Sequence, residues 1–232
     1  GKPLAIISGG SGYVGSAISS TLNNTGWNVA VLSRDTQKSG GAYQCDITNE
    51  REVHAVVGDI VDKYGAIDAC IHAAATSIVN KSLLAASVES FEIPLRVAVR
   101  GAFLLAKAVV PHMKAGASFI GITSKLIESE MVLPPTGSYV TAKYGLRGLL
   151  RTLASEVRTK DIRVYAVAPG FLLGGLNDGV SPEMINFLAS KSGAGTTTVE
   201  EVATLVQTLC TVQDSYPTGS SITIPPITVT LL

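Results

Sequence analysis

A tyrosine and a lysine, Tyr139 and Lys143, stand four residues apart in a segment whose pattern predicts a helix over residues 137–159. Side chains at this spacing lie on one face of a helix, so we expect the lysine ammonium beside the phenol. A free phenol titrates at about pH 10, and a neighbouring positive charge favours its ionised form. The pair therefore predicts a tyrosine that exchanges a proton near neutral pH.

A glycine-rich turn near the start of the chain predicts a dinucleotide site. The apolar run at residues 4–7 is typical of a buried parallel strand, and the turn SGGSGYVG at residues 8–15 leads into a helical pattern. Glycines there allow the backbone to approach a pyrophosphate, whose charge lies at the amino end of the helix. The alternative is an ordinary strand-to-helix turn.

Strand and helix patterns alternate along the whole chain. The expected strands are residues 3–8, 27–32, 42–45, 66–72, 117–123, 162–168 and 220–224, and the expected helices are residues 13–24, 49–64, 87–114, 137–159 and 198–212. This order predicts one α/β domain over residues 1–232, a Rossmann-type doubly wound parallel sheet with helices on both faces. Ligands bind beyond the carboxyl ends of such strands, so the irregular segments 125–136 and 171–198 are expected to cover a substrate.

Composition favours a small molecule as the partner. Eighteen basic residues balance eighteen acidic residues without a basic cluster, which argues against a nucleic-acid or anionic-membrane partner. We find neither an uninterrupted membrane-spanning stretch nor a signal-peptide pattern, so we expect a cytoplasmic protein. Cys45, Cys70 and Cys210 are interpreted as buried apolar side chains, and no spacing among the histidines predicts a metal site.

Together these motifs resemble the short-chain dehydrogenase/reductase family, and the resemblance runs from Pro3 to Ile224. In that family a serine ends the fifth strand upstream of the Tyr-x-x-x-Lys pair, and here Ser124 stands at that place. The resemblance implies that Ser124 holds the substrate oxygen, that Tyr139 transfers the proton, and that Lys143 binds the ribose and lowers the tyrosine pKa. Ser129, inside the irregular segment, is a weaker alternative to Ser124.

The resemblance also implies the residues that bind the cofactor. Asp46 and Ile47 match the pair that flanks the adenine, although Asp46 also suits a helix cap. The Pro-Gly turn at residues 169–170 matches the turn beside the nicotinamide, and the Thr-Gly pair at residues 218–219 matches the one that leads into the last strand. The complete predicted set is Gly9, Ser11, Gly12, Tyr13, Val14, Gly15, Ser33, Arg34, Asp46, Ile47, Ala73, Ala74, Ala75, Thr123, Tyr139, Lys143, Pro169, Gly170 and Leu172.

The end of the second strand favours NADP(H) over NAD(H). Relatives that use NAD usually place an acid there to accept hydrogen bonds from the ribose, whereas a 2′-phosphate requires a cation. This chain has Ser33 and Arg34 at that position, so we predict that both bind the 2′-phosphate. The adjoining Asp35 would weaken the preference.

Two motifs look like those of the extended branch of the family. Tyr13 replaces the middle glycine and Gly12 stands one position earlier, while His72 begins a segment that would be Asn-Asn-Ala-Gly in the short branch. The extended branch includes nucleotide-sugar epimerases, which need a sizeable carboxyl-terminal region for the sugar nucleotide. The chain stops soon after its last strand, so we expect a short-branch enzyme.

Two further departures leave the function open between two hypotheses. Ala98 stands where the family usually has a catalytic asparagine, and Gly174 stands where a threonine usually grips the nicotinamide amide. The first hypothesis is an NADP(H)-dependent reductase that converts a ketone, aldehyde or 3-oxoacyl thioester to an alcohol, with Tyr139 as proton donor. The second is a weakly active or non-catalytic NADP(H)-binding sensor or assembly subunit.

Apolar residues near the predicted site suggest an apolar substrate pocket, although they suit a core or a subunit contact equally well: Leu126, Ile127, Met131, Val132, Leu133, Phe171, Leu172 and Leu173. Glu128 and Glu130 are interpreted as solvated. Family members commonly pair the helices expected here at residues 87–114 and 137–159, so we expect a homodimer or homotetramer, and the apolar residues 229–232 are expected to pack on a neighbouring subunit.

Overall fold

The computed structural model describes residues 1–35, 42–77, 81–128, 136–213 and 215–232. Within these residues, eight strands form the central sheet in the order β10-β9-β6-β5-β4-β1-β2-β3, and all neighbours are parallel except β10, which runs antiparallel to β9. The strands are β1 (Leu4–Ser8), β2 (Asn28–Ser33), β3 (Tyr43–Gln44), β4 (Ile67–His72), β5 (Met113–Ile122), β6 (Arg163–Pro169), β9 (Ser220–Ile224) and β10 (Thr228–Leu231). The predicted doubly wound α/β fold is confirmed.

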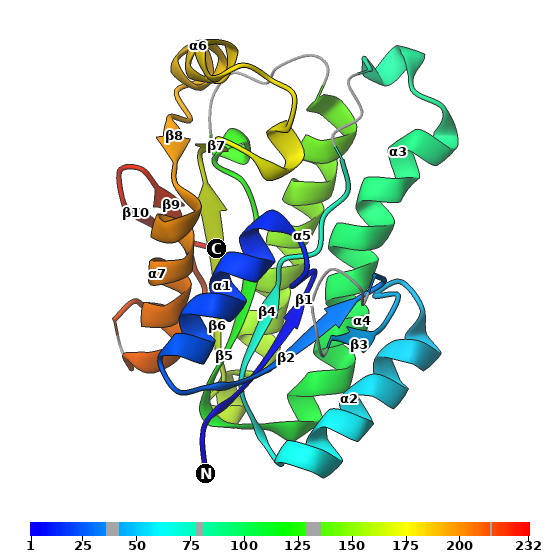
Figure 1. Ribbon diagram of the computed structural model, residues 1–232, viewed down its shortest axis with the longest axis vertical. Helices are drawn as coiled ribbons and strands as arrows, with labels where there is room; N and C mark the ends of the chain where they lie inside the picture. The colour runs from blue at the N-terminus through cyan, green and yellow to red at the C-terminus, as the bar shows by residue number, and fades with distance from the viewer. Residues whose placement is uncertain (36–41, 78–80, 129–135, 214) are drawn as a thin grey trace.

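Helices cover both faces of this sheet (Figure 1). On one face lie α1 (Tyr13–Asn24) and α7 (Val199–Thr211), and on the other lie α2 (Glu50–Tyr64), α4 (Gly101–Val109) and α5 (Gly137–Glu156). Because the strands are covered on both faces, alternate residues of one strand enter different cores. Ile6 packs with the α2, α4 and α5 side, while Ile7 packs with the α1 and α7 side.

Local capping signals fix several helix ends. The side chain of Asn49 caps α2 by accepting hydrogen bonds from the backbone of Arg51 and Glu52, and Gly65 ends that helix with a φ of 86°. Thr198 and Glu201 form a reciprocal capping box at the start of α7. These ends orient the helices against the sheet.

The helix predicted over residues 87–114 is confirmed only in part, because it contains a π turn and ends earlier than predicted. The structure has α3 (Val88–Leu95), a π-helix (Arg96–Arg100), α4 and a 3-10 turn (Val110–His112), after which β5 begins at Met113. Pro94 lies inside α3, where its ring removes one backbone donor just before the helix widens into the π turn. The interruption places Arg96 and Val97 against the cavity described below.

The segment 171–198 was expected to be irregular, and this is also wrong. It contains β7 (Phe171–Leu172), a 3-10 turn (Gly175–Asn177), α6 (Pro182–Ser192) and β8 (Thr196–Thr197), with β7 and β8 paired in parallel. In segment 125–136, residues 125–127 form a 3-10 turn. Short 3-10 turns also occur at Leu83–Ala85 and Arg158–Lys160.

Three other observations bear on the sequence analysis. Cys45, Cys70 and Cys210 are buried free thiols, as expected. Across the described ranges, none of the helices combines the length and apolar character that crossing a membrane requires. Residues 228–231 form the exposed edge strand β10, so part of the apolar carboxyl end pairs with the chain's own sheet, and its packing on a neighbouring subunit stays a prediction.

Candidate active site

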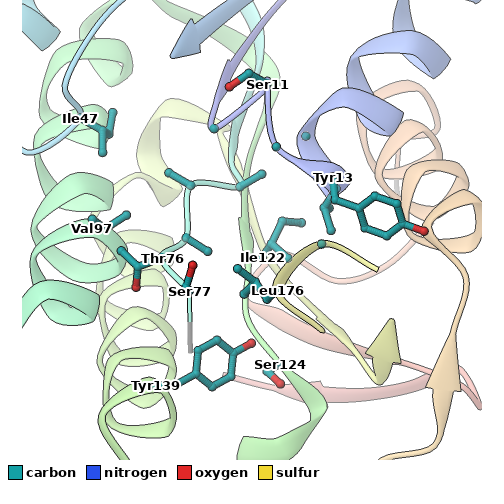
Figure 2. Close-up of a pocket in the computed structure, with 18 of the residues that line it drawn as sticks. Ser11, Tyr13, Ile47, Thr76, Ser77, Val97, Ile122, Ser124, Tyr139 and Leu176 are labelled. Atoms are coloured by element: carbon teal, nitrogen blue, oxygen red, sulfur yellow. The ribbon is translucent and has the colours of Figure 1, made fainter. Parts of the chain in front are cut away.

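A cavity of about 970 Å³ opens at the carboxyl ends of the parallel strands (Figure 2). Strands β1, β2, β4, β5 and β6 all end at it, as expected for a doubly wound sheet. Every residue predicted to act in catalysis or to bind the cofactor lines this cavity. The structure therefore brings the whole predicted set together, while the role of each residue stays a prediction.

The glycine turn brings the main chain close to the next strand. Gly9 has a φ of +70°, and a β-carbon on it would lie 2.5 Å from the Cα of Ala74, which follows β4. A β-carbon on Gly15 would lie 2.3 Å from the carbonyl oxygen of Gly9. Gly12 is the N-cap of α1 and has no capping side chain, and the first helical turn carries no acidic residue. These features fit the pyrophosphate of a dinucleotide, whose oxygens would accept hydrogen bonds from the backbone at this helix end.

The three predicted catalytic residues come from the end of β5 and from the first turns of α5. Ser124 is buried, and its hydroxyl accepts a hydrogen bond of 3.3 Å from the backbone of Leu126. Figure 2 shows the hydroxyl of Tyr139 turned toward Ser124. Lys143 is only 4% exposed, and its Nζ donates a hydrogen bond of 2.8 Å to the carbonyl oxygen of Ile122.

The expected lowering of the Tyr139 pKa is not found in the protein alone. Burial raises the pKa of Tyr139 above its ordinary value, and a hydrogen bond with the Ser124 side chain offsets this only in part. The Nζ of Lys143 lies 5.5 Å from the ring centroid, over the ring face, and is bonded to Ile122. Helical spacing gives a shared face but not the direction of the ammonium, so the lowering of the Tyr139 pKa by Lys143 stays a prediction for the cofactor-bound protein.

Lys143 itself has a strongly altered pKa. Burial lowers the pKa of Lys143 from its ordinary value of 10.5 to about 8, because the surrounding protein disfavours the charged form. The ammonium is still the major form near neutral pH. A buried cation at the cavity wall is suited to ribose hydroxyls and to an electron-rich phenolate.

The β2 end of the cavity carries the groups predicted to select the cofactor. The buried hydroxyl of Ser33 hydrogen-bonds the Ser11 hydroxyl at 2.6 Å, which joins the second strand to the glycine turn. Arg34 is exposed beside it. Burial acts to raise the pKa of Asp46, but hydrogen bonds from Thr48 outweigh it, helped by the charge of Arg34, so the pKa lies below its ordinary value.

Asp46 is not the helix cap that the sequence allowed. Its Oδ1 accepts hydrogen bonds of 2.9 and 2.8 Å from the backbone and hydroxyl of Thr48, and Asn49 is the N-cap of α2. The carboxylate of Asp46 is therefore fixed at the cavity wall by a local turn.

Ala98 lies in the π-helix and is buried behind the cavity wall. Near it lies His72, the last residue of β4, whose Nδ1 is hydrogen-bonded to the Ser8 hydroxyl at 2.8 Å. Burial, with a smaller contribution from the charge of Lys143, lowers the pKa of His72 to about 3, although the backbone of Ala98 and Val97 acts in the opposite direction. His72 is therefore neutral at physiological pH.

Several cavity residues were missed by the sequence analysis: Leu32, Cys45, Thr48, Thr76, Ser77, Ile93, Arg96, Val97, Ile122, Gly175, Leu176 and Asn177. Thr76 and Ser77 follow Ala75 directly, so the strand end was a usable signal for them. The end of α3 and the π turn bring three further residues to the cavity, Ile93, Arg96 and Val97. Pro94 is the one sequence signal for this π turn.

Of the apolar residues predicted to form a substrate pocket, three line the cavity: Leu126, Phe171 and Leu172. Ile127 is buried in a small core. Leu173 is exposed. Met131, Val132, Leu133, Ser129 and Glu130 lie outside the described residues.

Glu128 is not solvated as expected. Its carboxylate accepts hydrogen bonds from Arg147 at 3.0 Å and from Ser221 at 3.2 Å, and its side chain is 19% exposed. The ion pair links the segment after β5 to α5 and β9. Among the described residues no cluster of histidine, cysteine and acidic side chains is arranged to hold a metal ion.

Comparisons with known proteins agree with this geometry. The family described as "Enoyl-(Acyl carrier protein) reductase" matches residues 13–225. A 3-oxoacyl-[acyl-carrier-protein] reductase FabG of Rickettsia bellii is 29% identical over 94% of this chain and 93% of its own length. The bovine (Bos taurus) dehydrogenase/reductase SDR family member 4 is 29% identical over 95% of this chain and 85% of its own.

A solved structure of a blue fluorescent protein from a metagenomic library, in complex with NADPH, has the same fold. It superimposes with a TM-score of 0.85 at 22% sequence identity and covers 96% of each chain.

Proposed function

The chain belongs to the short-chain dehydrogenase/reductase family, and we propose that this NAD(P)-dependent oxidoreductase uses NADPH to reduce a carbonyl group to an alcohol. The candidate substrates are ketones, aldehydes and 3-oxoacyl thioesters. The observation that carries the proposal is the meeting of Ser124, Tyr139 and Lys143 in the cavity that the glycine turn also lines.

The bound nicotinamide would supply a hydride to the carbonyl carbon. As the carbonyl oxygen gains negative charge, the hydroxyl of Ser124 donates a hydrogen bond to it and the phenol of Tyr139 gives it a proton. The charge of Lys143 would favour the resulting phenolate, and its Nζ would hold the ribose hydroxyls of the bound cofactor. The reverse oxidation uses the same groups.

Burial of the site supports this division of roles. Ser124 and Lys143 are 6% and 4% exposed, so the groups that meet the developing charge are largely shielded from water. Electrostatic interactions are stronger in such a setting than in bulk solvent. Leu126, Phe171 and Leu172 line the cavity and would exclude water from a bound substrate.

NADPH is proposed over NADH on the charge at the end of β2. Arg34 can donate hydrogen bonds to a 2′-phosphate, and the Ser33 hydroxyl lies beside it at the cavity wall. The NADPH carried by the metagenomic relative is consistent with this choice.

A second function, cofactor binding with little catalysis, is favoured by one observation. Ala98 occupies the buried centre of the π-helix, and its methyl group cannot hold a water molecule that relays protons toward Lys143. A sensor or an assembly subunit would tolerate this change, whereas a fast reductase requires another route for the proton.

The two functions are separated by NADPH oxidation with a panel of ketones, aldehydes and 3-oxoacyl thioesters. We expect turnover by the native chain and its loss in Tyr139→Phe, with NADPH binding retained. Tyr64→Phe is the matched control because Tyr64 is a half-exposed phenol on α2 outside the cavity. Tight NADPH binding without oxidation of any substrate would support the cofactor-binding protein instead.

We also propose that the chain forms a homodimer or homotetramer through α4 and α5. Phe103 on α4 and Tyr144 on α5 are 53% and 48% exposed, although both are large and apolar in character. Sedimentation is expected to show an oligomer at micromolar concentration, and a monomer there would refute the proposal.

A further inference from the structure

Tyr13 connects two walls of the cavity by a direct contact within the protein. It is the first residue of α1, directly after the glycine turn, and its side chain is 41% exposed. Its hydroxyl donates a hydrogen bond of 3.2 Å to the carbonyl oxygen of Leu173. Residues 171–177, which we term the covering segment, comprise β7 and the following turn, and Figure 2 shows Tyr13 beside it.

The covering segment passes so close to Tyr13 that a side chain at either of two glycines would crowd this residue. A β-carbon on Gly174 would lie 3.0 Å from the Cζ of the ring, and one on Gly175 would lie 2.8 Å from the Cβ of Tyr13. Both glycines have positive φ, +137° and +65°, a conformation that other residues adopt with strain.

Two departures from the family pattern, Tyr13 and Gly174, are therefore in contact with each other. The family's threonine at position 174 would meet the ring of Tyr13 and a backbone conformation that disfavours it. With glycine at both 174 and 175, the segment lies directly on the ring. Gly174 is thus explained by Tyr13, which itself replaces a glycine of the turn.

The covering segment is held at its start by the pairing of β7 with β8, and it is braced internally beyond that pairing. The side chain of Asn177 donates a hydrogen bond of 2.8 Å to the carbonyl oxygen of Leu172, and the backbone of Asn177 donates one of 3.3 Å to Gly174. Leu172, Leu176 and Asn177 line the cavity.

We propose that Tyr13 is a positioning residue that holds the covering segment against the glycine turn and thereby slows release of the bound cofactor. It acts through its hydrogen bond to Leu173 and its close contact with Gly174. The proposal rests on the proposed function in that the cavity binds a nicotinamide dinucleotide.

The first test is the dissociation rate of NADPH, measured by stopped-flow fluorescence with excess NADP⁺ as the chase. We expect Tyr13→Ala to raise this rate about tenfold and Tyr13→Phe, which lacks only the hydroxyl bond, to raise it about threefold, without a lower association rate. Tyr64→Phe should leave it unchanged. If a variant only contained less folded protein, the amplitude of the NADPH fluorescence change would fall and the dissociation rate would stay the same.

The second test is a double-mutant cycle with Gly174→Ala. The added methyl group meets the ring only when Tyr13 is present, so the rate increase in Tyr13→Ala/Gly174→Ala should be smaller than the product of the single increases. Increases that multiply, or an unchanged rate in Tyr13→Ala, would overturn the proposal.

Amide hydrogen exchange of residues 171–177 without cofactor separates this proposal from the proposed function. Faster exchange of these amides in Tyr13→Ala, with native exchange in the β1 and β4 strands, supports the anchor. Unchanged exchange refutes it. A native chain that binds neither NADPH nor NADH would refute the proposed function, and the exchange result would still decide whether Tyr13 holds the segment.

Discussion

The buried ammonium of Lys143 should make the stability of the protein depend on pH in a predictable direction. The folded pKa is about 8, against an ordinary value of 10.5, so between these values the unfolded chain binds more protons than the folded one. The free energy of unfolding therefore rises with pH in this window. Below about pH 8 the folded protein carries a charged group that burial disfavours.

The magnitude follows from the two pKa values. Between about pH 7 and about pH 9.5, the Lys143 contribution to the unfolding free energy should increase by about 2 kcal/mol. Lys143→Met keeps the length of the side chain and removes the titrating group. The gain in stability with pH should thus be about 2 kcal/mol smaller in Lys143→Met than in the native chain, and its turnover should be lost.

The assay is urea unfolding of the cofactor-free protein at both pH values. Lys160→Met, which removes an exposed lysine after α5, is the control and should follow the native curve. Other titrating groups are common to all three proteins and cancel in the comparison. Equal gains in the native chain and in Lys143→Met would show that Lys143 titrates like an exposed lysine, and the argument from burial would be wrong.

Arg34→Ala should reduce the ratio of NADPH to NADH affinity by about 10- to 100-fold, as expected for the loss of a charge-assisted hydrogen bond. The control Arg51→Ala, on α2, should leave this ratio unchanged, and fluorescence titration measures both affinities. The pKa of His72 is about 3 in the folded protein, so on lowering the pH from about 7 to about 5 the unfolded chain binds a proton that the folded chain does not. The unfolding free energy of the native chain should therefore fall by about 2 kcal/mol over this range, and urea unfolding should find no such loss in His72→Gln. Gly9→Ala should lower the unfolding free energy by about 3 kcal/mol, because the added β-carbon meets the Ala74 backbone. Gly26→Ala, where the β-carbon has open space, should lower it by only about 1 kcal/mol, and similar losses in the two variants would contradict the contact.

The central strands β1, β4 and β6 were predictable because each is a short, mainly apolar run that is buried on both faces. The predicted strand over residues 66–72 and the observed β4 (Ile67–His72) differ by one residue, and the predicted helix over residues 13–24 matches α1. Burial on both faces leaves few alternatives for such sequences. The resemblance to the family named most of the site residues, and the strand pattern explains why they meet, since the carboxyl ends of parallel strands lie at one edge.

Some missed elements did have signals in the sequence. Ser181 caps α6, Pro182 stands at its start and Gly193 ends it with a φ of 70°, which together are typical helix boundaries. Pro94 likewise marks the interruption before the π-helix.

Other features had no local signal. Spacing places Tyr139 and Lys143 on one face, but only the fold determines that the Nζ of Lys143 bonds to Ile122, 21 residues away in sequence. The ion pair of Glu128 with Arg147 and the contact of Tyr13 with Leu173 also depend on tertiary packing.

The crowded glycine turn separates positions that maintain the architecture from positions open to substitution. Three glycines of this turn have no room for a side chain. A β-carbon would lie 2.5 Å from the Ala74 backbone at Gly9, 2.7 Å from the Val31 side chain at Gly10, and 2.3 Å from the Gly9 carbonyl oxygen at Gly15. Ser11 and Tyr13, between them, have accessible side chains. A combinatorial library limited to these two positions would therefore vary the grip on the cofactor while leaving the strand ends in place, which makes this turn a practical starting point for engineering cofactor turnover.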